Sequence, residues 1–261
     1  MRFERRAQRT VLAERRHDGP LVVQKPLYPE GDAVCHTIVV HPPGGIAGGD
    51  DLELCANAGE GAHALLTTPG ASKWYRSAGP AARQHIGFDL KEGARLEWLP
   101  QETIVFDGAI AEMRFRLELA DAARYIGWEI LCLGRTGSGE RFSSGQCRFD
   151  TEIRREGKLI WVERGDLRGG GTLLDSPAGL DRRTVCATMI AAAGDLGPKT
   201  LGACRNALDE TVALTLLPGL LIARSLGDSS EAAKSCFTRL WSVLRFPLLG
   251  REAHMPRIWS T

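Results

Sequence analysis

The 261-residue sequence lacks the cysteine pattern of a disulfide framework or a redox site. Its seven cysteines are odd in number, widely scattered, and nowhere form a C-x-x-C pair. Most of them lie in apolar stretches such as Ile130-Leu-Cys132-Leu133, where a free cysteine behaves as a small hydrophobic residue. These features favour a reducing cytoplasm and predict unpaired thiols that pack in the core.

Long apolar runs and an excess of one charge are also missing. The longest apolar stretch, residues 212–223, is interrupted by Thr215 and Pro218 and is too short to cross a bilayer. Four of the first six residues are charged, and they hold no apolar segment of the kind found in a secretory signal. Because the formal net charge is only +1, nothing in the overall balance favours nucleic acid or an acidic membrane surface. We therefore expect a globular protein of the cytoplasm that binds neither membrane nor nucleic acid.

The signature motifs of common enzymes and metal sites are absent. The sequence holds no G-x-x-x-x-G-K-[ST], no G-x-S-x-G and no H-E-x-x-H, and residues 44–49 have the wrong spacing for a dinucleotide-binding turn. The nearest approach to a ligand cluster is Cys35 and His36 with His41 shortly after them. At strand spacing Cys35 and His36 point to opposite faces, so we predict no tight zinc or nickel site.

Short strands dominate the first two thirds of the chain. Residues 112–119 alternate polar and apolar side chains without a break, which is typical of a half-buried strand. Gly, Pro, Asp and Asn cluster between the apolar runs, as turns require. The expected strands cover residues 21–23, 34–40, 52–56, 64–68, 84–90, 95–99, 112–119, 123–133, 146–153 and 159–163, with two more at 212–217 and 220–223.

Helix signals come late in the chain. Asp228 and Glu231 resemble a capping box, and Phe237, Leu240 and Leu244 then recur at helical spacing until Pro247. A weaker helix is predicted after Pro198. We therefore predict a mainly β fold: a helically wound or sandwich-like antiparallel β body with a few α-helices in the C-terminal part, forming a single domain over residues 1–261.

A glycine-rich run at residues 41–51 is the most distinctive loop. Two prolines there fix the backbone and remove N–H donors, and the run ends in the paired carboxylates Asp50 and Asp51. The run also contains four glycines, Gly44, Gly45, Gly48 and Gly49. Glycine permits positive φ angles and close approach by another segment. A loop of this kind carries function more often than packing does.

Two further loops combine charge with aromatic or flexible residues. Residues 67–77 set Lys73, Tyr75 and Arg76 close together beside Trp74, and aromatic side chains next to arginine are typical of protein interfaces. Residues 134–145 mix glycine and serine with arginine and glutamate. By composition, either loop is an anion-binding loop or a long surface turn.

Carboxylates also stand at apolar or loop positions. Glu129 lies inside the apolar run 126–133 and Glu163 follows the apolar run 159–162, where a charge is costly unless it is paired, hydrogen-bonded or facing a wet cavity. Glu102 and Asp107 occupy loops between strands. One interpretation is a polar interior path for cations, and the other is that each carboxylate is paired with an arginine or faces water.

Taken together, several segments resemble the urease accessory protein D family, also called UreD or UreH. The resemblance spans nearly the whole chain, and its segments occur in the family's order. They are residues 41–51, 68–77, 97–102, 131–135, 139–143 and 256–260.

The resemblance implies a non-enzymatic role in urease maturation. Members of this family bind apo-urease and, with accessory protein F and, through F, the GTPase accessory protein G, help to deliver nickel to the dinickel active site. It implies no tightly bound cofactor, because nickel is in transit. In the family, interior acidic residues are proposed to line the nickel route, and the matching positions here are Asp50, Asp51, Glu129 and Glu163. It also implies that the C-terminal helix and the chain end, with Arg257 and Trp259, contact accessory protein F, although a terminal Trp can equally fold back on its own core.

Two alternatives stay open on the sequence. The first is a β-rich carbohydrate-active hydrolase that uses a pair of carboxylates such as Glu102 and Glu129, which would require an open, aromatic-lined groove. The second is a stand-alone nickel-binding protein, which would require tight, stoichiometric nickel binding by the isolated chain.

Overall fold

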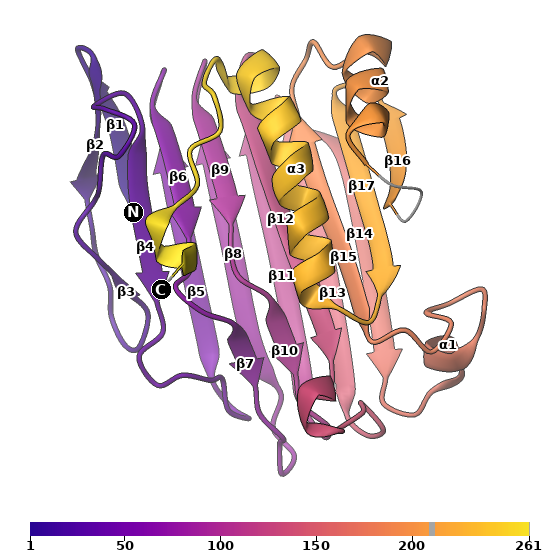
Figure 1. The fold of residues 1–261 in the computed structure, drawn as a ribbon. Helices are drawn as coiled ribbons and strands as arrows, with labels where there is room; N and C mark the ends of the chain where they lie inside the picture. Colours follow the sequence, from indigo (N-terminus) through magenta and orange to yellow (C-terminus); the bar gives the residue numbers. More distant parts are fainter. Residues whose placement is uncertain (209–211, 261) are drawn as a thin grey trace.

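The chain winds back and forth between two β-sheets in a computed structural model that describes residues 1–208 and 212–260 (Figure 1). We call these the first sheet and the second sheet. The first sheet has the order β14-β13-β11-β8-β5-β1-β2. Its strands are β1 (Arg2–Arg6), β2 (Arg9–Glu14), β5 (Asp51–Ala58), β8 (Ala82–Leu90), β11 (Ile110–Leu119), β13 (Gln146–Arg155) and β14 (Lys158–Arg168).

The second sheet has the order β16-β17-β15-β12-β9-β6-β4-β3, and β10 and β7 add to it beside β12. Its strands are β3 (Val22–Val23), β4 (Cys35–Val40), β6 (His63–Thr67), β7 (Ser72–Trp74), β9 (Arg95–Leu99), β10 (Thr103–Val105), β12 (Arg124–Leu133), β15 (Val185–Ala192), β16 (Val212–Leu217) and β17 (Leu220–Gly227). The helical elements are η1 (Thr136–Ser138), α1 (Thr172–Asp175), α2 (Pro198–Asn206), α3 (Ser230–Leu249) and η2 (Arg257–Ser260).

Successive long strands alternate between the sheets, so each strand pairs with one from the neighbouring turn of the winding. Strands β4, β6, β9 and β12 join the second sheet, whereas β5, β8, β11 and β13 join the first. Because each turn returns the chain in the same direction, these neighbours pair in parallel. The mainly β, helically wound architecture is confirmed.

The antiparallel pairing expected for the body occurs only at its margins. It is found for β1 with β2, β3 with β4, β13 with β14, and the run β12-β15-β17-β16. The expectation was wrong for the central strands, because short alternating strands separated by turns look the same in sequence whether they form hairpins or a coil.

The described residues form three apolar clusters, of which one lies on the outer side of the second sheet and two lie between the sheets. Between the sheets, the inward side chains of the first sheet, such as Leu54 and Phe88, meet those of the second, such as Leu66 and Trp98. On the outer side, Leu65, Ile126 and other residues of the second sheet pack against α3. The molecule is therefore layered as sheet, sheet and helix.

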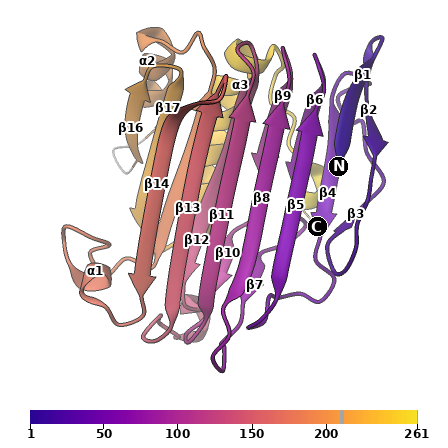
Figure 2. The ribbon, with the colours of Figure 1, turned by 180° about the vertical axis from the view of Figure 1, so that it is seen from behind.

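On the opposite face of the first sheet, the described residues place no helix (Figure 2). Charged residues alternate in sign across its strands in register, from Asp51 to Arg83, Glu112, Arg148 and Asp166. Glu112 forms ion pairs with Arg83 at 3.0 Å and with Arg148 at 3.4 Å. Cross-strand pairs of this kind suit a sheet face that stays in water.

A buried ionic cluster fastens α3 to the second sheet. The Arg245 guanidinium donates to both oxygens of Glu97 on β9, at 3.0 and 3.1 Å, and to both oxygens of Glu30, each at 2.6 Å. His63 on β6 and Trp241 on α3 complete the partners of Glu97, at 2.8 and 2.6 Å. Arg245 and Glu97 are both fully buried. Because every carboxylate oxygen has a partner, the cluster meets the condition under which buried charge is tolerated.

The cluster lowers the pKa of its carboxyl groups. Burial acts to raise the pKa of Glu30, but the hydrogen bonds from His36 and Arg245 lower it to about 2. Burial likewise opposes ionisation of Glu97, and His63 and Arg245 hold its pKa below the ordinary value. Both carboxyl groups are thus ionised at neutral pH, facing a guanidinium.

The boundaries of α3 differ from those expected. Ser229, not Asp228, caps the helix, because its side chain accepts from the Ala232 N–H at 3.1 Å. Asp228 instead binds Arg183 at 2.6 Å. Pro247 lies inside the last turn and the helix ends at Gly250, whose φ of 68° is left-handed. The helix predicted after Pro198 is confirmed as α2.

Replacing Arg245 tests how far the cluster stabilises the fold. Arg245→Met removes the guanidinium but keeps an apolar stem, which leaves Glu30 and Glu97 buried without a cation. We expect the free energy of unfolding to fall by about 3–5 kcal/mol in urea denaturation at pH 7. The exposed Arg205→Met on α2 serves as the control and should change it by no more than about 0.5 kcal/mol. Equal stability of the two variants would show that the cluster does not hold α3.

Candidate functional site

A cavity of about 570 Å³ lies between the two sheets, toward the edge where β14 faces β17. Its volume falls in the range of small-molecule sites, about 300–1,000 Å³. Most of its wall is apolar, including Trp98, Tyr125 and Phe149. Its lining also includes Glu129, Glu163 and Arg224, which come from separate strands.

Glu129 projects from β12 into this cavity. Odd-numbered residues of β12 face the first sheet, whereas Ile126, Trp128 and Ile130 face α3. The Glu129 Oε1 atom is buried without a hydrogen-bond partner among the described residues. Burial raises its pKa to about 7, and a hydrogen bond with Thr103 only partly opposes this. Glu129 is therefore a carboxyl group poised between its neutral and charged forms near neutral pH.

Glu163 reaches the cavity from β14 and is already paired. Its Oε1 accepts from Nη2 of Arg224 on β17 at 2.8 Å, so this ion pair joins the edge strand of the first sheet to the second sheet. The Glu163 side chain is 17% exposed and that of Arg224 47%. The pair is partly open to solvent, so the charges are screened and can separate at modest cost.

Cys186 lines the same cavity and is a cysteine that could in principle bind a metal. Burial raises its pKa to about 12, and the charges of Glu129 and Glu163 add to the effect. The group is therefore a neutral thiol, which is a poor ligand for a divalent cation. Within residues 1–208 and 212–260, no three His, Cys, Asp or Glu side chains gather as a metal-binding group.

Asp50 and Asp51 lie outside this cavity. Asp50 accepts from the Ala47 N–H at 2.8 Å and closes the turn before β5. The Asp51 side chain is 62% exposed, with its Oδ1 3.8 Å from His85. The interior placement expected for these two carboxylates was wrong, because Asp51 starts β5 on the solvent side, where alternate residues point away from the core.

The glycines of residues 41–51 make room for the neighbouring loop. Ile46 pairs with Trp74 as an isolated bridge, and a Cβ on Gly45 would lie 2.3 Å from the Tyr75 ring. A Cβ on Gly48 would lie 2.4 Å from Ser77 Oγ. Gly44 and Gly49 instead hold positive φ angles of 80° and 96°. Residues 41–51 and 72–77, which are separate in the sequence, thus pack together as one surface, which we call the loop end.

Asp107 holds this loop end together. It accepts from the backbone N–H and hydroxyl groups of Ser143 and Ser144, and from Arg76 at 2.8 Å. Burial acts to raise the pKa of Asp107, but the serine hydrogen bonds lower it to about 2. The Tyr75 ring packs on Phe106 with centroids 5.3 Å apart. Lys73, Tyr75 and Arg76 remain exposed on this rigid surface.

Trp259 folds back onto the outer side of the second sheet. Its ring packs on Trp128 and Trp241, at centroid distances of 5.8 and 6.2 Å, and its Nε1 donates to Thr67 Oγ1 at 2.8 Å. Of the two outcomes that the sequence left open for a terminal tryptophan, the structure has the packed one. Arg257 in the same turn is exposed.

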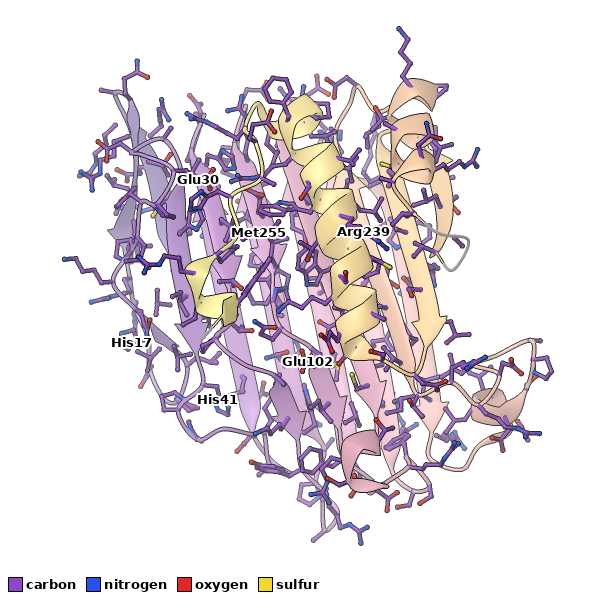
Figure 3. All side chains as sticks on the ribbon, in the orientation of Figure 1. His17, Glu30, His41, Glu102, Arg239 and Met255 are labelled. Carbon is purple, nitrogen blue, oxygen red and sulfur yellow. The ribbon has the colours of Figure 1, made fainter. Side chains whose placement is uncertain are left out.

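The remaining candidates do not assemble into a site. Glu102 does not line the cavity and lies near the start of α3, so it forms no catalytic pair with Glu129 (Figure 3). Cys35 is buried between the sheets, and His36 turns away to Glu30 at 2.5 Å, as their alternate strand positions predict. His41 lies apart on the loop after β4 (Figure 3). All seven cysteines are free, as predicted.

Sequence reasoning missed Arg224, Thr103 and the Arg245 cluster. Arg224 follows an apolar strand in the same way that Glu163 does, so a search for arginines at such positions would have found it. Nothing in the sequence links Glu30 with Arg245, which are 215 residues apart.

Comparison with known proteins gives a consistent result. The family model described as UreD urease accessory protein matches residues 1–260. A protein named urease accessory protein UreD from Dechloromonas aromatica is 54% identical over 265 residues, covering 99% of this chain and 92% of the relative. Proteins of the same name from an Azoarcus species and Nitrosococcus oceani are 54% and 49% identical, covering 99% of this chain and 92% and 88% of their own lengths.

The raised pKa of Glu129 makes stability depend on pH. A carboxyl whose pKa is higher in the folded state favours folding below its unfolded value near 4.5, and this contribution is lost as the pH rises through about 7. In urea denaturation, the free energy of unfolding of Glu129→Gln relative to the wild type should therefore increase between pH 4.5 and 8, by up to about 3 kcal/mol. Exposed Glu60→Gln should show no such gain. A parallel pH dependence of wild type and Glu129→Gln would contradict the assigned environment.

Proposed function

Because the chain belongs to the UreD family of urease accessory proteins, we propose that it is a scaffold that conveys nickel during urease maturation. As a member of this family it is an accessory protein and not an enzyme. It binds apo-urease together with accessory protein F and, through F, the GTPase accessory protein G. The observation that carries the nickel proposal is the cavity between the sheets, which Glu129 and Glu163 line from separate strands.

The chemistry of the cavity suits an ion in transit. Carboxylate oxygens bind Ni²⁺ less tightly than imidazole or thiolate groups do, so the ion can leave. Arg224 competes with a cation for Glu163, at 2.8 Å, which weakens binding further. Glu129 must lose a proton before it binds a metal, so each passage there is coupled to proton release.

The proposed route is confined to the cavity residues. Asp50 and Asp51 stand on the surface, so they remain candidates only for an entry or exit outside the cavity. No observation favours a carbohydrate hydrolase, since the expected pair of Glu102 and Glu129 is not formed.

Two surfaces suit the partner proteins. The first is the loop end with Lys73, Tyr75 and Arg76, where hydrogen bonds to Asp107 fix the backbone and reduce the entropy lost on binding. The second is the solvent side of α3, where Phe246 is 58% exposed. We assign the α3 surface to accessory protein F, since a large exposed aromatic is typical of an interface anchor.

Replacing a carboxyl group that lines the cavity tests the route. In cells expressing urease with its accessory proteins, Glu129→Gln and Glu163→Gln should each lower nickel-dependent urease activation several-fold. Both variants should still be recovered with tagged urease subunits. Glu60→Gln, a distant surface change, should activate like the wild type. Normal activation by both cavity variants would remove these residues from the route.

A pull-down tests the assigned partners. The chain should co-purify with tagged urease structural subunits and with accessory protein F. Phe246→Asp places a charge in the assigned interface and should reduce recovery of accessory protein F at least tenfold. Leu159→Asp puts the same charge at an exposed apolar position on β14 of the first sheet, away from α3, and should leave recovery unchanged. Absence of any complex with co-expressed, folded partners would refute the scaffold proposal.

A further inference from the structure

A second, smaller recess of about 150 Å³ lies apart from the interior cavity. It is formed where the loop after β12 meets the turn between α1 and β15, near Gly170. Arginine side chains line it from both segments, with Arg141 on one side and Arg182 and Arg183 on the other. Ser143 and Thr184 add hydroxyl groups, and Asp175 is the acidic residue of its wall.

The turn that carries Arg182 holds an unusual backbone. Asp181 and Arg182 are consecutive left-handed residues with φ of 46° and 61°, a conformation that is costly without glycine. Hydrogen bonds maintain it, from the Asp181 N–H to Ser176 O at 2.9 Å and from the Arg182 N–H to Leu174 O at 2.8 Å. The turn is thus held against α1, with Arg182 at the recess.

The loop that carries Arg141 is fixed equally well. Its neighbour Phe142 is 4% exposed, and Ser143 is tied to Asp107 through both N–H and hydroxyl groups. A Cβ on Gly134 would lie 2.9 Å from the Arg141 Cα, so the start of the loop packs directly under Arg141. Both walls of the recess are therefore formed before any ligand arrives.

Positive charge in the recess is only partly compensated. Arg183 is committed to Asp228, with Nη1 to Oδ2 at 2.6 Å. Arg141 and Arg182 form no ion pair within the part of the chain that the structure describes. Against these two free guanidinium groups stands the single carboxylate of Asp175. Like charges brought together on rigid loops repel each other unless an anion lies between them.

We propose that this recess binds a small oxyanion of the phosphate class. Guanidinium groups present parallel N–H donors that match the oxygens of such an anion, and two of them can contact it from opposite sides. The volume admits a single tetrahedral oxyanion and excludes a whole nucleotide. The site is independent of the proposed nickel route, since the two cavities share none of their lining residues.

Titration with inorganic phosphate tests the proposal on the purified full-length chain. The ionic strength is held constant with chloride, and binding is followed by calorimetry. The wild type should bind one phosphate per chain, and sulfate should compete with it. Arg141→Gln and Arg182→Gln should each weaken binding at least tenfold. Asp175→Asn should strengthen it several-fold, because that change removes the carboxylate that repels the anion.

Arg205→Gln on α2 is the matched control, since Arg205 is also an exposed arginine but lies at the other end of the molecule (Figure 1). It should bind phosphate like the wild type, and the melting temperature without phosphate should be the same in all variants. Equal binding by wild type and the Arg141→Gln/Arg182→Gln double variant would overturn the proposal. The proposal would also fail if the wild type bound no measurable phosphate at a 50-fold excess of phosphate over millimolar protein. It would fail as well if the wild type bound more than one phosphate per chain and Arg205→Gln lowered that number, because phosphate would then bind exposed arginines in general.

Discussion

The alternation of successive strands between two sheets is the constraint on which the rest of this structure depends. Each strand finds its neighbours one turn earlier and one turn later, so β8 lies between β5 and β11 and pairs with both in parallel. No hairpin in the central body can form alone, and stability there requires several turns at once. The loops of successive turns are also stacked at the same end, which brings residues 41–51, 72–77, 103–109 and 140–145 into one packed surface held by Asp107.

The winding leaves the second sheet with two buried faces and the first with one. Burial on both faces explains why β12 and β15 are nearly continuous in apolar residues, whereas β5 alternates strictly. Covering the outer side falls to α3, and apolar contact is supplemented there by the Arg245 cluster. That cluster connects the segment at Glu30, three strands and the helix, so it fixes how α3 lies as well as how strongly it binds.

Sequence reasoning recovered the elements whose pattern reflects a local rule. Residues 112–119 alternate polar and apolar side chains, and β11 follows them. The strand β15 was missed because Val185–Ala192 is rich in alanine, which has little preference for strands and was placed by its neighbours in the sheet. Parallel pairing and the Glu163–Arg224 contact could not be predicted from the sequence, because both depend on which turns of the winding lie side by side. Glu129 could be found because a carboxylate inside an apolar strand needs a physical explanation.

The cavity lies between the two sheets, and the Glu163–Arg224 pair on its wall joins β14, the edge strand of the first sheet, to β17 of the second. A well-packed apolar contact at this position would have closed the cavity to solvent. An unpaired carboxylate there would have carried a large desolvation penalty, because little water reaches it. An ion pair that is partly exposed satisfies both demands, because it holds the edges together at 2.8 Å and can exchange its partner. Glu129, deeper inside, gains the same reversibility from its proton, since a group with a pKa of about 7 changes charge at little cost. A cation on the proposed nickel route would therefore compete with an arginine at Glu163 and with a proton at Glu129.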